Sequence, residues 1–234
     1  MKRLNRNHLK YLAIVAMVVD HVAWAFVPTV SLLGQLMHLF GRLTGPLMAF
    51  FLAEGYAHTR DVKKYALRLG IFALLSWVPF SLFETWRPFY PLFGVIYTLF
   101  LGLLAVWLWD KAKLPVWVKA LAVAALCFLS RWGDWPIFDV LWPLAFFLFR
   151  DDEKKKWTAY CLISLLILQY ILGLTPWWRG IFQLGVFLVP LLVHFCYNGE
   201  SGSKAPFHKW FFYVFYPAHL LVLYALKLLY YSGY

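Results

Sequence analysis

Charged residues are scarce in this chain. They make up 14% of its 234 residues, against about 25% in a typical soluble domain. Acidic residues are especially few, with 11 set against 22 lysines and arginines. Hydrophobic residues make up 63% of the sequence, and a water-soluble fold would have too little polar surface to cover them. The composition therefore excludes a soluble globular protein and indicates a membrane protein.

Cysteine is also scarce, and this excludes two further classes. Cys127, Cys161 and Cys196 lie inside apolar segments without the spacing of metal ligands, so we expect neither a disulfide framework nor a metal site. The formal net charge of +11 would suggest a nucleic-acid partner for a soluble protein. Here the positive residues lie between the apolar segments, where a topology signal explains them, and no nucleic acid is expected.

Long apolar runs are what the sequence does have. About 20 apolar residues span the hydrocarbon core of a bilayer, so each such run predicts a transmembrane helix. The fifth and sixth runs are short and could form one re-entrant unit, and residues 29–38 could form a short interfacial helix. No linker or repeat divides the chain, so we predict an all-α polytopic membrane protein with a single domain over residues 1–234. The nine predicted helices are 9–28, 39–58, 65–83, 90–109, 115–130, 136–149, 157–173, 180–197 and 210–230.

The basic residues are divided unevenly between the two sets of loops. With the N-terminus in the cytoplasm, seventeen of the 22 fall on the cytoplasmic side and Arg42 lies within or near a helix, so only Arg87, Arg131, Arg179 and Lys227 fall outside. This is the positive-inside pattern, and it predicts a cytoplasmic N-terminus and an odd number of helices. The cytoplasmic residues are Lys2, Arg3, Arg6, Lys10, Arg60, Lys63, Lys64, Arg68, Lys111, Lys113, Lys119, Arg150, Lys154, Lys155, Lys156, Lys204 and Lys209.

Ionisable side chains inside the apolar runs need a reason, because each costs at least about 2.5–3.5 kcal/mol at the centre of a membrane helix. We predict that Asp20, His21, Arg42 and Asp139 gather in the external half of the membrane, with His219 nearby. Arg42 could instead only neutralise one of the two aspartates. For the other polar residues of these runs we expect a structural role or a position at the membrane interface. They are His38, Glu54, His58 and His194.

His21 is the strongest candidate for a functional role. It follows Lys10 by eleven residues, just over three helical turns, so the two side chains share a helix face about 16 Å apart along the axis. Histidine takes and returns a proton near neutral pH, and Asp20 or another carboxylate could orient its ring. We therefore predict His21 as a general base.

Three blocks of the sequence stand out together. They are Leu9 and Lys10 through Met17-Val18-Val19-Asp20-His21; Gly41-Arg42 with Pro46-Leu47 and Phe50; and Phe211-Phe212 through Phe215-Tyr216 and His219-Leu220. These blocks resemble the TraX family of membrane acetyltransferases. The Lys10–His21 spacing is also similar to the signature of bacterial membrane acyltransferases that O-acetylate surface polysaccharides.

This resemblance implies a protein of the bacterial inner membrane that moves acetyl from cytosolic acetyl-CoA to an amine or hydroxyl. The unknown acceptor would be a pilin-like N-terminus or a surface glycan. His21 would be the base, Asp20 or Asp139 would hold its tautomer, Arg42 would stabilise the oxyanion or bind the acceptor, and His219 could share either task. Cations at the cytoplasmic rim would bind the phosphates of CoA. The candidates are Lys10, His58, Arg60, Lys63, Lys64 and Arg68.

Two other functions fit the same residues. Buried acids and histidines also mark proton paths, so the chain could be a proton-coupled transporter of small solutes. It could also be a non-catalytic membrane assembly factor, which would tolerate the loss of His21, Arg42 and His219 together.

Overall fold

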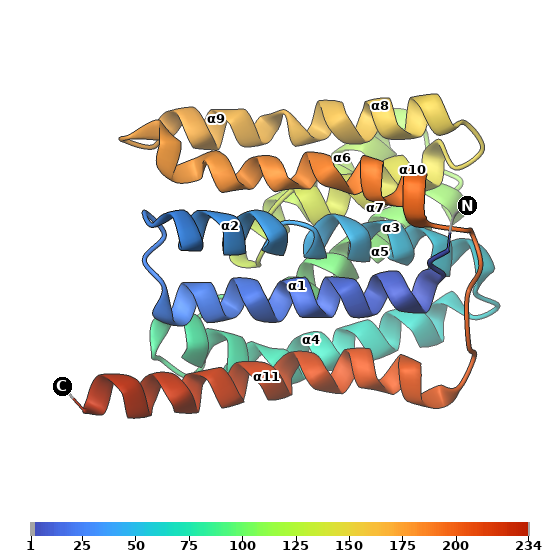
Figure 1. Ribbon diagram of the computed structural model, residues 1–234. Coiled ribbons are helices and arrows are strands. Elements are labelled where there is room, and N and C mark those ends of the chain that lie inside the picture. Colours follow the sequence, from blue (N-terminus) through green and yellow to red (C-terminus); the bar gives the residue numbers. More distant parts are fainter. Residues whose placement is uncertain (1–2, 234) are drawn as a thin grey trace. The chain divides into compact units, whose positions relative to one another are not determined.

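The computed structural model describes residues 3–233, and these residues are almost entirely helical (Figure 1). Beyond helices and turns, the described residues form only two isolated β-bridges, Leu4 with Tyr197 and Phe93 with Gly133. The prediction of an all-α fold is therefore confirmed. The elements are α1 Arg6–Phe26, α2 Leu32–Gly41, α3 Thr44–His58, α4 Val62–Thr85, α5 Val95–Lys111, α6 Val116–Leu129, η1 Ser130–Trp132, α7 Phe138–Leu148, α8 Glu153–Ser164, α9 Leu166–Gly173, η2 Trp177–Phe187, α10 Leu188–Cys196 and α11 Pro206–Ser232.

Six stretches of the described chain are long and apolar enough to cross a membrane. All nine predicted runs contain helix, but α5, α6 and α7 have 17, 14 and 11 residues. At 1.5 Å per residue these helices measure about 26, 21 and 17 Å, less than the roughly 30 Å of the hydrocarbon core. The count of nine is therefore not confirmed. The six stretches are Arg6–Phe26, Leu32–His58, Val62–Thr85, Glu153–Gly173, Trp177–Cys196 and Pro206–Ser232.

Most of the stretch 29–38 lies in a short helix, α2, that precedes α3, and its interfacial place stays a prediction. Ser31 caps the start of α2 by accepting a hydrogen bond from the Gly34 amide at 3.0 Å. From there α2 and α3 continue as one apolar stretch, Leu32–His58. Pro46 is tolerated because it lies in the first turn of α3, where its missing amide hydrogen would have no helical partner.

The contacts divide the chain into two compact units. The first runs up to Met48 and resumes at Ser164, and the second is Ala49–Ile163. The boundary thus falls within α3 and between α8 and α9. The single domain over residues 1–234 stays a prediction.

In the first unit, α1 packs against α2 and α11, and η2 packs against α2 and α9. The helices α1 and α11 run in the same direction, as their course in Figure 1 shows. Three contacts establish this, because their residue numbers increase together along both helices: Tyr11 with His208, His21 with His219, and Phe26 with Tyr230. The first and last helices of the chain are therefore parallel neighbours.

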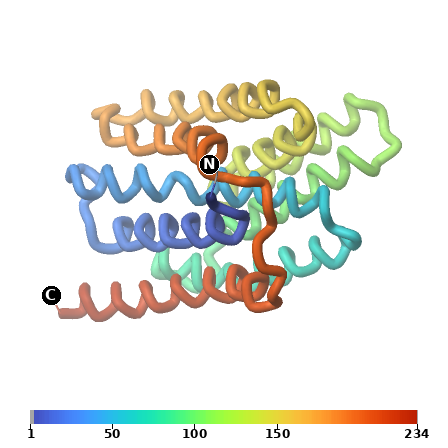
Figure 2. The backbone as a smooth tube through the Cα atoms, turned by 45° about the vertical axis from the view of Figure 1, so that its right-hand side comes forward, coloured from blue at the N-terminus to red at the C-terminus, as the bar shows by residue number. Residues whose placement is uncertain are grey.

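The start of α1 is held by its own cap and by the connection between α10 and α11. Asn5 and His8 form a reciprocal capping box at the first turn. The Leu4 amide donates to the Cys196 carbonyl at 3.0 Å, and the Asn7 side chain donates to the Ser203 carbonyl at 2.8 Å. Figure 2 shows this connection, in orange, passing the dark-blue start of the chain.

In the second unit, α5 is the central helix and packs against α4, α6 and α7. Gly102 of α5 allows α7 to come close, because a Cβ atom there would lie 2.1 Å from the Asp139 carbonyl oxygen. The loops at one end of α5 are joined by hydrogen bonds from the Phe93 amide to the Trp132 carbonyl and from the Asp134 amide to the Phe93 carbonyl.

Candidate functional site

A buried carboxylate joins three helical elements of the first unit. Asp20, on α1, accepts a hydrogen bond from His38 Nδ1 of α2 at 2.8 Å through Oδ1. Its Oδ2 accepts from the guanidinium of Arg42, and Arg42 also donates to Gln183 of η2 at 3.3 Å. Asp20, His38 and Arg42 are all buried. A charge in an apolar interior is stable only when it is paired, so this network holds Asp20 as an ionised acceptor.

Two glycines allow these elements to approach. A Cβ atom on Gly41 would lie 2.3 Å from the Asp20 Cβ and 2.5 Å from its Oδ1. A Cβ atom on Gly185 of η2 would lie 2.2 Å from the Leu39 carbonyl oxygen. Small residues at helix contacts bring backbones together in membrane bundles, and here they let Asp20 reach His38.

His38 lies between two aromatic rings. Its ring centroid is 4.1 Å from that of Trp24 and 5.0 Å from that of Phe182, and its exposed fraction is 0%. A carboxylate only accepts hydrogen bonds, so Nδ1 of His38 carries the hydrogen and Nε2 of the neutral ring carries the lone pair. Within residues 3–233, His38 Nε2 has no hydrogen-bond partner. The Asp20–His38 pair therefore has the geometry of an oriented base.

A second histidine pair joins α1 to α11. His21 Nδ1 lies 2.9 Å from the Met17 carbonyl oxygen and 3.2 Å from His219 Nε2. His219 Nδ1 lies 3.1 Å from the Phe215 carbonyl oxygen. Carbonyl oxygens only accept, so both rings carry hydrogen on Nδ1, and the His21 Nδ1–H is shared between Met17 and His219. This leaves the lone pair of His21 on Nε2.

The structure pairs Arg42 with Asp20, as one interpretation of Arg42 predicted, but gives other candidate residues partners that were not predicted. Asp20 was expected to orient His21, but its hydrogen bonds go to His38 and Arg42. His38 was expected near a hydrated helix end and is instead buried. The α2 sequence contains a signal for this: Gly34, His38 and Gly41 recur at helical spacing and form its buried face. Gln183 had no such signal.

Lys10 lies on the face of α1 that was predicted. Its Nζ lies 5.2 Å from the centre of the Phe212 ring of α11, while His21 contacts His219 on the same helix. Both side chains thus face α11, as the eleven-residue spacing requires.

Asp139 belongs to the second unit and not to the cluster around Asp20. It is fully buried in the first turn of α7, and Thr98 of α5 donates to its Oδ2 at 2.8 Å. Of the predicted catalytic set, contacts within the first unit therefore join Asp20, Arg42, His21 and His219.

The predicted CoA-binding cations other than Lys10 also lie in the second unit. His58, Arg60 and Lys63 are exposed around the connection between α3 and α4. Lys64 forms an ion pair with Asp61 at 3.5 Å, and the Arg68 guanidinium lies 5.5 Å from the centre of the Tyr65 ring. These side chains make the connection between α3 and α4 and the first turns of α4 basic.

The start of α4 is capped by Asp61. The backbone amide of Lys64 donates to its carboxylate at 2.9 Å, and this hydrogen bond lowers the pKa of Asp61 below the ordinary 3.8. An ionised carboxylate at a helix N-terminus is also favoured by the helix dipole.

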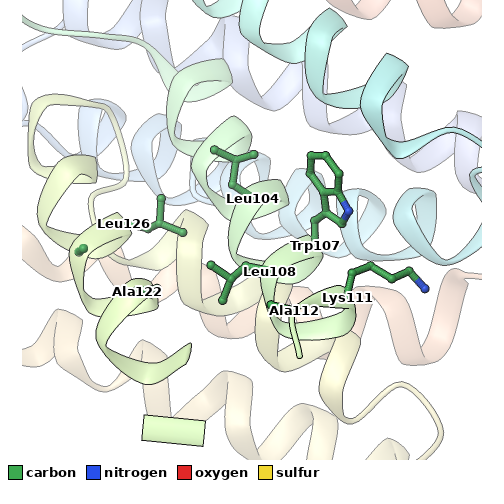
Figure 3. Close-up of a pocket in the computed structure, with 8 residues that line it drawn as sticks. Leu104, Trp107, Leu108, Lys111, Ala112, Ala122 and Leu126 are labelled. Atoms are coloured by element: carbon green, nitrogen blue, oxygen red, sulfur yellow. The ribbon is translucent and has the colours of Figure 1, made fainter. Parts of the chain in front are cut away.

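A groove of about 560 Å³ lies between α5 and α6 of the second unit (Figure 3). Its lining is apolar apart from Lys111 and includes none of the predicted site residues. Among residues 3–233, no three His, Cys, Asp or Glu side chains are grouped so that they could hold a metal ion. The lining residues are Leu104, Trp107, Leu108, Lys111, Ala112, Ala122, Ala125 and Leu126.

These features define a class: a polytopic helical membrane protein with a cluster of histidine, aspartate and arginine buried between its first, second and last helices. The chain belongs to the TraX family, whose model, described as TraX protein, matches residues 5–227. It is 34% identical over 233 residues to the probable fimbrial assembly protein FimC, serogroup H1, of Dichelobacter nodosus, with 94% of each chain covered. No solved structure matches it. The resemblance seen in the sequence is thereby confirmed.

Proposed function

We propose that this TraX-family protein is a transmembrane acetyltransferase that moves acetyl from cytosolic acetyl-CoA to an amine or hydroxyl of its acceptor. The supporting observation is the buried cluster of the first unit, in which Asp20, Arg42 and three histidines lie within a bundle of apolar helices. Ionisable groups at membrane depth are costly and generally functional. A passive membrane anchor would not need them.

The chemistry requires a base and a group that stabilises negative charge. The acceptor nitrogen or oxygen attacks the thioester carbonyl carbon, its proton passes to a base, and the C–S bond breaks as CoA leaves as the thiolate. His21 and His38 are suitable bases because each neutral ring carries a lone pair on Nε2, whereas the Nε2 lone pair of His219 accepts from His21. Arg42 supplies a positive charge for the oxyanion or the acceptor.

Acetyl-CoA would enter from the cytoplasmic side of the inner membrane. Lys10 fits its phosphates, because it lies near the start of α1 and shares the His21 face of that helix. His58, Arg60, Lys63, Lys64 and Arg68 of the second unit are a separate set of candidates for binding phosphates, since cations form strong hydrogen bonds with phosphate oxygens.

The acceptor is a protein N-terminus or a surface glycan. The Dichelobacter nodosus relative is a probable fimbrial assembly protein, which favours a pilin-like protein acceptor over a glycan. An assembly role and acetylation of a pilin subunit are compatible.

The test uses the purified full-length protein in lipid nanodiscs with labelled acetyl-CoA. A peptide with a free N-terminus and an oligosaccharide serve as acceptors, and the products are identified by mass. We expect acetyl transfer by the wild type and its loss in His21→Ala and Arg42→Ala. The control is His194→Ala, because His194 is an exposed residue of α10. Full activity in His21→Ala would remove His21 from the site.

Two further experiments distinguish the two other functions. Solute flux driven by a pH gradient in liposomes, without CoA release, would indicate a transporter. Normal surface fibres in cells that carry the triple variant of His21, Arg42 and His219 would indicate a non-catalytic assembly factor.

A further inference from the structure

We propose that His38, oriented by Asp20, is the base that takes the proton from the acceptor, an inference that rests on the proposed acetyl transfer. The Asp20 Oδ1 to His38 Nδ1 distance of 2.8 Å is that of a good charge-assisted hydrogen bond. It fixes the hydrogen on Nδ1 and the lone pair on Nε2. A carboxylate that orients an imidazole in this way also stabilises the imidazolium formed when the ring takes a proton.

The His21 ring is held by different hydrogen bonds. Its Nδ1–H is shared between the Met17 carbonyl and the neutral His219 ring. Neither partner carries the negative charge that Asp20 offers His38. Asp20 also interacts electrostatically with His21, but the hydrogen bond by which it orients a ring is the one to His38. Arg42 holds the other oxygen of Asp20 and so keeps the carboxylate ionised.

The two histidines also lie on different sides of α1. His21 and Lys10 face α11. Asp20 faces α2, where it meets His38 and Arg42. A CoA whose phosphates are held by Lys10 would therefore have to present its acetyl group on the His38 side of α1.

Access to His38 is controlled by Trp24. The His38 side chain is fully buried, but the Trp24 ring that covers it at 4.1 Å is itself 45% exposed. Rotation of one half-exposed side chain would therefore uncover His38. On the other side lies Phe182 of η2, an eleven-residue 3₁₀ segment, whereas such segments rarely exceed three or four residues. A long 3₁₀ segment has poorer hydrogen-bond geometry than an α-helix, so η2 is easier to deform than an α-helix in the same place would be.

In the proposed step the acceptor N–H proton moves to His38 Nε2 while the nitrogen forms a bond to the acetyl carbonyl carbon. The C–S bond of acetyl-CoA breaks and CoA leaves as the thiolate. His38 then returns its proton to water. Only acetyl-CoA and the acceptor are consumed.

The experiment separates acceptors that need a base from one that does not. Glycinamide is largely protonated at neutral pH and needs a base, whereas hydroxylamine is a strong nucleophile that is largely unprotonated. The replacement His38→Asn keeps an N–H that can donate to Asp20 but removes the basic nitrogen. General-base catalysis contributes about 10²–10⁴-fold, so glycinamide transfer should fall by that factor while hydroxylamine transfer changes little. The same change at His194, which is exposed, is the matched control.

The outcomes are distinguishable. Equal loss with both acceptors would show that His38 is only structural and would overturn the proposal, as would unchanged glycinamide transfer. Wild-type protein that transfers acetyl to neither acceptor would instead refute the acetyltransferase function itself. If His38→Asn does not fold, the same comparison is made in His38→Ala. Rescue of its glycinamide transfer by added imidazole supports the base, and wild-type transfer without imidazole refutes it.

Discussion

The sharpest structural prediction concerns Gly41, the last residue of α2. In Gly41→Ala the added methyl group would lie 2.3 Å from the Asp20 Cβ and 2.5 Å from its Oδ1. Ordinary contacts between carbon atoms are about 3.5–4.0 Å, so Asp20 must move by more than 1 Å. Its hydrogen bond to His38 is 2.8 Å long and would not survive that displacement.

The size of the effect follows from two destabilising terms and one stabilising term that partly offsets them. Overpacking a tight contact costs about 1–3 kcal/mol, and losing a hydrogen bond to a charged group costs about 1.5–3 kcal/mol. Replacing glycine by alanine in a helix offsets about 1 kcal/mol of this. We therefore expect a net loss of about 3 kcal/mol, which lowers Tm by roughly 6–12 °C in a chain of this size.

The assay is thermal unfolding of the purified variant in detergent, followed by far-ultraviolet circular dichroism. Gly70→Ala in α4 is the control, because the nearest atom to its new methyl group would be an ordinary 3.6 Å away, on Phe100. That variant should melt at or slightly above the wild-type temperature. If Gly41→Ala melts with the wild type, or Gly70→Ala falls as far, the close approach of Asp20 does not support the fold as argued.

Three further predictions follow from the structure. Gly102→Ala should lower Tm by several degrees in the same assay, since overpacking costs about 1–3 kcal/mol and a methyl group there would lie 2.1 Å from a backbone carbonyl oxygen of α7. The folded-state pKa of Asp61 is lowered by the Lys64 amide, so its stabilising effect is present above its unfolded pKa and is lost as pH falls through the folded value. The Tm difference between wild type and Asp61→Ala should therefore shrink in acid. In a cysteine-free background, Ser203→Cys and Ser232→Cys should be labelled by an impermeant maleimide from opposite sides of the membrane, because they lie at the two ends of α11.

Helix formation was predictable from the sequence because it depends on local composition. Each of the nine apolar runs contains helix, and the spacing of Lys10 and His21 placed both side chains on the α11 face. The lengths of α5 to α7 were less predictable. The run 90–109, for example, begins in a loop, and its helix starts only at Val95.

The partners within the site were harder to predict, because they depend on the register of one helix against another. The sequence places Asp20 beside His21, but the side chains of neighbouring helical residues point about 100° apart. Gly41 then lets α2 approach Asp20, and this contact directs the carboxylate to His38. A glycine in sequence signals a close approach without identifying the partner.

The parallel course of α1 and α11 constrains the number of membrane crossings. When the first and last spans of a chain run in the same direction, the total number of spans is odd. The six long stretches alone would give an even number. If those six cross, an odd number of α5, α6 and α7 must also cross, which gives seven or nine. The basic residues after α5, at 111–119, and after α7, at 150–156, follow the positive-inside pattern only if both groups lie on the cytoplasmic side. That condition requires α5 to cross, while α6 and α7 either both cross or together turn back within the membrane.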